Sequence, residues 1–283
     1  MTLVLPAASN RRPGRFSHYE IAVFAAAAIL LLMAVLGPLL APSSIYDSDM
    51  VNTLAPPDAT HWLGTDDQGR DIFWRIIAGA RVSLLSSMLV VALYSVIGIA
   101  VAALATVGPR WLDELLMRAT DIGLALPGMV VALGFAAALG PSLQSGIIAL
   151  SITGWPMTAR ILRTTMAQTM TQPYVEGARV LGASKARLML RHVLPNSLDT
   201  LIVKWAADIS YTLLILAGLS FIGVGAQPPT PEWGAMISDA RGYITDAWWA
   251  VAAPGAAIAI NAIVFGLLAD ILQVRRDPSL RRG

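Results

Sequence analysis

The sequence predicts an all-α membrane protein with six transmembrane helices and with both chain ends in the cytoplasm. Hydrophobic residues make up 56% of the 283 residues and charged residues only 13%, about half of the charged share of ordinary soluble proteins. Apolar runs of about 20 residues recur along the chain, which is the length of a helix that crosses a bilayer core of about 30 Å. Arginine and lysine gather in alternate loops, as the positive-inside rule requires. This composition excludes a soluble fold and a disordered chain.

Six apolar runs define the predicted spans. They are residues 21–40, 82–107, 115–139, 143–162, 198–224 and 248–274, within one transmembrane domain, 21–274, between the tails 1–20 and 275–283. Because Arg11, Arg12 and Arg15 precede the first run, a secretory signal peptide is the alternative for it. The run is longer than a signal-peptide core and Ala41-Pro42 is a poor cleavage site, so we expect a retained helix.

The run 143–162 is the weakest, since serine, threonine, Gly154 and Pro156 thin its apolar character. Charge decides whether it spans the membrane. With six spans and the N-terminus inside, the inner segments hold every arginine and lysine except Arg70, Arg75, Arg81 and Arg241. Removing the fourth span would move the arginine-rich segment 160–191 to the outside, against the positive-inside rule. Six spans are therefore favoured over five.

The two outer loops are acidic and differ in predicted structure. Apolar residues recur at helical spacing between 71 and 81, which predicts an amphipathic helix lying in the membrane interface before the second span. Pro228, Pro229 and Pro231 prevent regular helix in the second loop, and Trp233 is expected at the outer membrane boundary as an anchor. Such loops suit either the docking of a soluble partner or a solvated cap.

The inner segment between the fourth and fifth spans is patterned. Pro173 can open a helix at its first turn, and Glu176 then lies where the helix dipole favours an acid. Gly182 ends this helix, Ser184 caps a second one, and Pro195 stops the second helix before the fifth span. The two short helices, the 173–195 knob, suit the groove of a partner. The alternative is a surface helix whose arginines face lipid phosphates.

Charges within the spans favour internal ion pairs over a catalytic site. Lys204 and Asp208 are spaced i, i+4 in the fifth span, and Asp121 follows Arg118 by three residues in the third, so each is expected to pair on its own helix. Histidine and acidic residues form no metal or catalytic pattern. The sequence contains no G-x-x-x-x-G-K-[ST] loop for nucleotide phosphates, so this chain does not bind nucleotide by that device.

Three motifs in the expected order resemble one family of permeases. Residues 174–184 have the sequence YVEGARVLGAS and 192–196 the sequence HVLPN, which resemble the EAA loop of ABC importer permeases. The segment 61–71, HWLGTDDQGRD, resembles the entry to the second span of dipeptide/oligopeptide/nickel-type permeases. So do 218–225, GLSFIGVG, and 227–234, QPPTPEWG.

The resemblance implies a type I ABC importer permease fold and a set of partners. Such a permease pairs with a homologous second permease, sits on two cytoplasmic ATPase subunits or a fused one, and receives substrate from an extracytoplasmic binding protein. The 173–195 knob would be the coupling helix, with the ATPase-coupling residues Glu176, Gly177, Ala178, Gly182, Ala183, Leu194 and Pro195. Gly177 stands where the motif has its first alanine.

The same resemblance sets the remaining expectations. The chain would hold no cofactor, with ATP and Mg in the ATPase subunits, and would lie among lipid in a bacterial cytoplasmic membrane without binding nucleic acid. Its cargo would be di- or oligopeptides, although nickel chelates and other solutes are also carried by such permeases. The pathway residues are unassigned. The alternatives are an ATP-independent secondary transporter, which needs ion-coupling acids in mid-membrane, and an intramembrane enzyme, which needs a nucleophile and base there.

Overall fold

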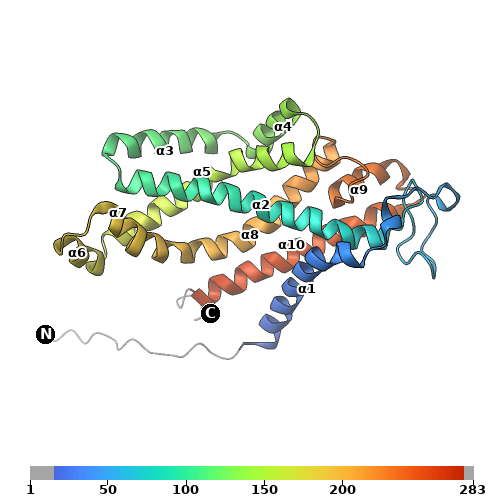
Figure 1. Cartoon of the computed structure of the whole chain (residues 1–283), viewed down its shortest axis with the longest axis horizontal. Coiled ribbons are helices and arrows are strands. Elements are labelled where there is room, and N and C mark those ends of the chain that lie inside the picture. Colours follow the sequence, from blue (N-terminus) through green and yellow to red (C-terminus); the bar gives the residue numbers. More distant parts are fainter. Residues whose placement is uncertain (1–15, 277–283) are drawn as a thin grey trace.

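A computed structural model of the chain describes residues 16–276, and this part is a helical bundle without β-strands (Figure 1). The predicted tails therefore lie largely outside the described residues. The helices, in order, are α1 His18–Leu40, α2 Ile72–Val107, α3 Arg110–Ala125, α4 Gly128–Leu139, α5 Leu143–Met170, α6 Pro173–Val180, α7 Lys185–Leu188, α8 Leu194–Ile222, α9 Trp233–Ala240 and α10 Trp248–Arg276.

Four helices are long and apolar enough to cross a membrane, namely α1, α2, the continuous helix Lys185–Ile222 that contains α7 and α8, and α10. α3 and α4 meet the same requirement as a pair bent by 88°. α5, which contains the weak run 143–162, does not meet it, although it has 28 residues and runs alongside α2 (Figure 1). Several of its hydroxyls bond to its own backbone, as Ser151 Oγ does to the Ile147 carbonyl at 2.7 Å, so these polar residues are tolerated inside a bundle. By its length and position, α5 corresponds to the fourth predicted span and brings the number of predicted spans to six.

The predicted interfacial helix 71–81 is instead the start of α2, without a break before 82–107. α2 has 36 residues, about 54 Å at 1.5 Å per residue, so it projects beyond a bilayer core of about 30 Å. The Asp71 side chain caps it by accepting a hydrogen bond from the Trp74 amide at 3.1 Å. Ile72 and Arg75 are buried, so this part of α2 packs within the protein rather than lying on lipid.

The predicted third span, 115–139, is sharply bent rather than straight. α3 ends at Ala125 and α4 begins at Gly128. Pro127 has no amide hydrogen and disfavours helical geometry in the residue before it. Leu126 accordingly has extended backbone, with φ −93° and ψ 139°. The proline thus accounts for the 88° bend.

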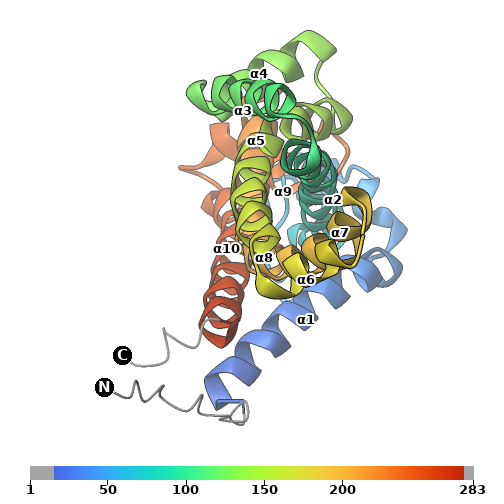
Figure 2. The ribbon, with the colours of Figure 1, turned by 90° about the vertical axis from the view of Figure 1, so that its left-hand side faces the viewer.

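Three hydrophobic clusters hold the bundle together along its length. One joins α1, α2, α8, α9 and α10, the next joins α2, α4, α5 and α8, and the last joins α2, α5 and α8 to α6 and α7. Seen end-on, α2, α5 and α8 stand in the middle, with α1 on one side and α3 and α4 on the other (Figure 2). α2 and α5 can approach closely because Gly98 has no side chain. An added Cβ there would lie only 2.8 Å from Thr158 of α5.

A charged contact joins the two ends of the described chain. Arg275 near the end of α10 donates two hydrogen bonds to the Glu20 carboxylate at the start of α1, at 2.8 and 2.7 Å. In Figure 1 both helix ends lie away from the segment between α1 and α2, which is at the far right of the molecule. This is the arrangement that six spans with both ends on one side require.

Candidate functional site: the 173–195 knob and the polar network at the opposite end

The knob forms from local signals in its own sequence. Pro173 is the first residue of α6, as predicted, and Glu176 lies in its first turn. The amide of Gly182 bonds to the Arg179 carbonyl at 2.9 Å and the amide of Ala183 to the Ala178 carbonyl at 3.1 Å, which is the Schellman pattern that ends a helix. Gly182 has φ +85°, a backbone conformation that side chains with a Cβ disfavour.

The second half of the knob differs from the prediction at Pro195. Ser184 caps α7, as predicted, by accepting from the Arg187 amide at 3.3 Å. α7 does not stop at Pro195 but continues into α8 through a π-helical turn, Met189–Val193, whose closing bond runs from the Leu194 amide to the Met189 carbonyl. Pro195 lies in the first turn of α8, where a missing amide hydrogen is tolerated. The knob and α8 are therefore one continuous helical unit.

One face of the knob is fixed to the bundle. Val175, Leu188, Met189 and Val193 are each no more than 3% exposed and share a hydrophobic cluster with buried residues of α2, α5 and α8. Deletion of such a buried side chain typically costs about 2–5 kcal/mol. The knob is therefore packed firmly against these helices and is not a loose loop.

The other face of the knob is open. An added Cβ at Gly177 or Gly182 would meet no atom within 4 Å, and Val180 and Leu181 are 81% and 90% exposed. Among the residues expected in coupling, Glu176, Gly177, Gly182 and Pro195 are exposed, whereas Ala178, Ala183 and Leu194 are half-buried. Glu176 pairs with Arg179 at 2.7 Å. Bare glycines beside exposed apolar side chains leave room for the close approach of another protein.

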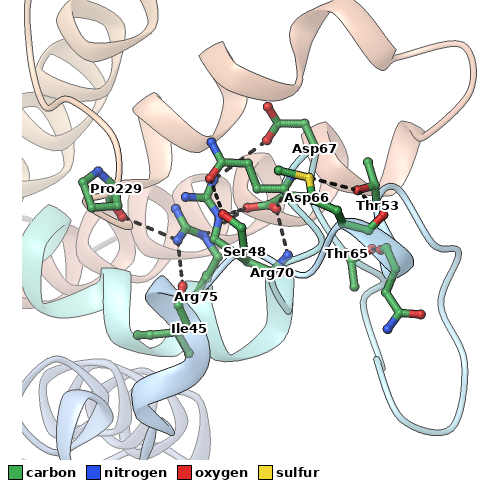
Figure 3. A network of polar contacts seen from close by, with 12 residues as sticks. Ile45, Ser48, Thr53, Thr65, Asp66, Asp67, Arg70, Arg75 and Pro229 are labelled. Carbon is green, nitrogen blue, oxygen red and sulfur yellow. Dashed lines mark hydrogen bonds and ion pairs between the residues drawn. The ribbon is translucent and has the colours of Figure 1, made fainter.

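The opposite end of the bundle carries a buried polar network centred on Asp66 (Figure 3). One oxygen of its carboxylate accepts from the Arg70 amide at 2.9 Å and the other from Arg70 Nε at 2.7 Å, while Arg75 Nε lies 3.4 Å away. Arg75 also donates to the carbonyl of Ile45 at 3.0 Å and to that of Pro229 at 3.5 Å. The network therefore ties the segment before α2 to α2 itself and to the loop after α8.

A second contact at this end attaches the start of α9. Glu232 is 1% exposed and caps α9 by accepting from the Ala235 amide at 2.8 Å, and Ser83 of α2 donates to its other oxygen at 3.2 Å. Burial raises the pKa of Glu232. Trp233 is fully buried, with its indole N–H on the Ile76 carbonyl at 3.0 Å. It is thus a core residue rather than the membrane anchor that the sequence predicted.

Arg70 and Arg75, which the sequence places among the outer positive charges, are buried, and this burial was not predicted. The available signal was spacing, since Asp66 and Arg70 are i, i+4 and Asp67 and Asp71 flank the same turn. The two outer segments fold over one another at this end and form a packed cap. Asp67 and Asp239 also lie in this cap, where burial raises the pKa of both carboxyls.

Within the spans, one predicted ion pair is confirmed and one is wrong. Lys204 and Asp208 pair with each other, and the Tyr94 hydroxyl of α2 donates to the same carboxylate at 2.5 Å. Asp121 pairs with Arg160 of α5 rather than with Arg118, because α3 packs beside α5. Among residues 16–276, no group of three histidine or acidic side chains is arranged to hold a metal.

Comparison with known proteins identifies a family and relatives that this chain resembles. The family described as binding-protein-dependent transport system inner membrane component matches residues 95–282. A relative from Escherichia coli, "Probable D,D-dipeptide transport system permease protein DdpC", is 40% identical over 88% of this chain and 84% of its own. The di/tripeptide transport system permease protein DppC of Pseudomonas aeruginosa is 37% identical over 100% of this chain and 96% of its own.

A solved structure shows the same fold at low sequence identity. A chain of the MetNI methionine ABC transporter, in an inward-facing conformation, matches with a TM-score of 0.59 and 17% identity, over 72% of this chain and 97% of that one. The fold is that of a type I ABC importer permease, and the relatives favour an importer over an ATP-independent secondary transporter. The chain belongs to the family of binding-protein-dependent transport system inner membrane components and is a multi-pass permease subunit of the cytoplasmic membrane, not an enzyme.

Proposed function

We propose that this chain forms, with a homologous second permease, the pathway through which an ATP-driven importer carries di- or oligopeptides. The observation that carries the proposal is the 173–195 knob, fixed to the bundle on one face and open on the other. The substrate class rests on the relatives, whose names specify D,D-dipeptides and di- and tripeptides. Peptides would be delivered by an extracytoplasmic binding protein to the outer cap.

The knob would enter a groove of a cytoplasmic ATPase subunit, one of two copies or half of a fused one. Gly177 and Gly182 would allow the close approach, and Val180 and Leu181 would supply apolar contact. Ala178 and Ala183 would support this surface from beneath. Leu194 and Pro195 lie at the junction with α8, so they would pass the movement of the knob into the bundle.

Energy would reach the pathway through this contact. ATP and Mg would bind in the ATPase subunits, and closure of those subunits would displace the knob. Because α7 and α8 are continuous and α6 packs on α5, the displacement would tilt α5 and α8 together. Such rocking switches access from one side of a membrane to the other.

Uptake by reconstituted vesicles tests this function. Vesicles would contain the complete complex and its binding protein, with ATP on the ATPase side and labelled alanyl-phenylalanine on the other. We expect accumulation that requires ATP and the binding protein. Replacing Gly182 with tryptophan should abolish uptake while the permease pair still reaches the membrane. Uptake without ATP by this chain alone would instead establish a secondary transporter, and uptake of nickel chelates but not of peptides would overturn the substrate class.

A further inference from the structure

A cavity of about 280 Å³ lies inside the bundle at the level of the Lys204–Asp208 pair. Its walls come from α2, α5 and α8 and from the bend between α3 and α4, and most of them are apolar. Its volume is just below the usual range for ligand sites, about 300–1,000 Å³, so it suits part of a small ligand. The polar side chains that line it are Tyr94, Thr153, Lys204, Asp208, Tyr211 and Thr212.

The charged pair is held in place from a second helix. Lys204 and Asp208 both belong to α8, with side chains 14% and 18% exposed. The hydroxyl of Tyr94 on α2 donates to the oxygen of Asp208 that also receives Lys204, and Lys204 Nζ lies 5.3 Å from the centre of the Tyr94 ring. Gly154 of α5 leaves room for this ring, since an added Cβ would lie 2.6 Å from it.

This pair differs from the ion pairs that join α3 to α5. Arg163 pairs with Asp113, and Arg160 with Asp121, and both pairs tie α5 to α3 without lining the cavity. The Lys204–Asp208 pair joins two residues of one helix, and its link to another helix is the hydrogen bond from Tyr94 of α2 to Asp208. Charges at this depth are unfavourable in a bilayer unless they serve a site or a partner. Asp208 lies midway along α8, and the pair faces open space there.

We infer that the cavity is a binding station on the peptide pathway, where Lys204 holds the free C-terminal carboxylate of the substrate. The inference rests on the proposed function. An ammonium has three N–H donors, so Lys204 can bind a substrate carboxylate while it keeps a bond to Asp208. Tyr94 continues to donate to Asp208 when Lys204 turns toward the substrate, so Asp208 is never left without a donor. The apolar walls then receive the last side chain of the peptide.

Comparison of a peptide with its amide tests the inference in the complete complex. Uptake of alanyl-phenylalanine and of its C-terminal amide is measured with one binding protein in all arms. Lys204→Met should lower uptake of the free acid about tenfold or more, the equivalent of about 1.4 kcal/mol, and leave uptake of the amide within about twofold. Arg163→Met removes a charge from an ion pair outside the cavity and should lower neither substrate selectively.

A second variant separates the site from a structural ion pair. The double substitution Lys204→Asp with Asp208→Lys keeps an i, i+4 pair on α8 but moves the ammonium by one helical turn. We expect it to lose free-acid uptake as the single variant does. Wild-type uptake of the free acid by the exchanged pair, or an equal loss of acid and amide in Lys204→Met, would overturn the inference. Absence of peptide uptake by the wild-type complex would instead refute the proposed function.

Photolabelling of the wild-type complex gives a result even if the variants fail to assemble or the amide fails to enter. The probe is a dipeptide with a diazirine on its C-terminal side chain, illuminated during turnover and followed by peptide mapping. Labels on 90–94, 124–129, 150–157 or 204–215, reduced by excess alanyl-phenylalanine, are expected from the cavity lining. Labels confined to other segments of the permease pair would overturn the inference.

Discussion

Replacing Gly177 with leucine should change the affinity of the knob for a partner without lowering the stability of the isolated permease. Gly177 lies inside α6, and an added side chain meets no atom of this chain within 4 Å. Leucine favours helix over glycine by about 0.5–1 kcal/mol, so the isolated permease should keep or slightly increase its stability. In a docked groove the same side chain overfills a packed contact, which costs about 1–3 kcal/mol, or about 5- to 150-fold in affinity.

The matched control is Gly177→Ala, which restores the alanine that EAA-type permeases have at this place and gains helix propensity with only one added carbon. We expect Gly177→Ala to bind the ATPase subunits and to transport normally, and Gly177→Leu to lose both. Binding is measured by co-purification of the ATPase subunits, stability by thermal unfolding of the permease, and transport by ATP-dependent peptide uptake. Normal ATPase binding and uptake by Gly177→Leu would refute the assignment of this face to coupling.

Three further predictions concern the outer cap. Asp66→Ala leaves Arg70 and Arg75 buried without their carboxylate and should destabilise the complex by about 3–5 kcal/mol, seen in thermal unfolding; an unchanged midpoint would contradict the network. Trp233→Ala should cost about 3–5 kcal/mol in the same measurement, because this side chain is fully buried, and a change below about 1 kcal/mol would contradict its place in the core. Burial, and then the charge of Asp66, raises the pKa of Asp67. Protonation of Asp67 therefore stabilises the folded protein. This contribution to the free energy of unfolding is complete below the ordinary carboxyl pKa and is lost as pH rises through the raised pKa. Asp67→Asn should therefore be more stable than wild type at pH 7 and should vary less with pH, and a wild-type pH slope would contradict this.

Much of the helical arrangement could be predicted because the membrane imposes it. Apolar length and the distribution of arginine indicate the helices and the shared side of the chain ends, and Pro173, Gly182 and Ser184 mark the knob by local backbone chemistry. These signals act within a few residues, so one sequence is enough to detect them. The exposed surface of the knob also follows from its small residues.

Features that depend on distant contacts were not predictable from the sequence. The partner of Asp121 is Arg160 on another helix, and local spacing suggested Arg118 because spacing along one helix does not show that α3 packs against α5. Arg75 and Trp233 are buried only because the loop after α8 folds over the start of α2. The cavity beside Lys204 likewise requires four segments to meet, and no single segment signals it.

The composition of the purified complex tests the central claim most directly. The tagged chain is extracted in mild detergent from its native membrane, and its partners are identified and counted by mass spectrometry. An ATP-driven importer requires one homologous permease and two ATPase domains for each copy of this chain, with the ATPase subunits missing when Gly182 carries a bulky side chain. A monomer or homodimer that still accumulates solute without ATP would contradict the account.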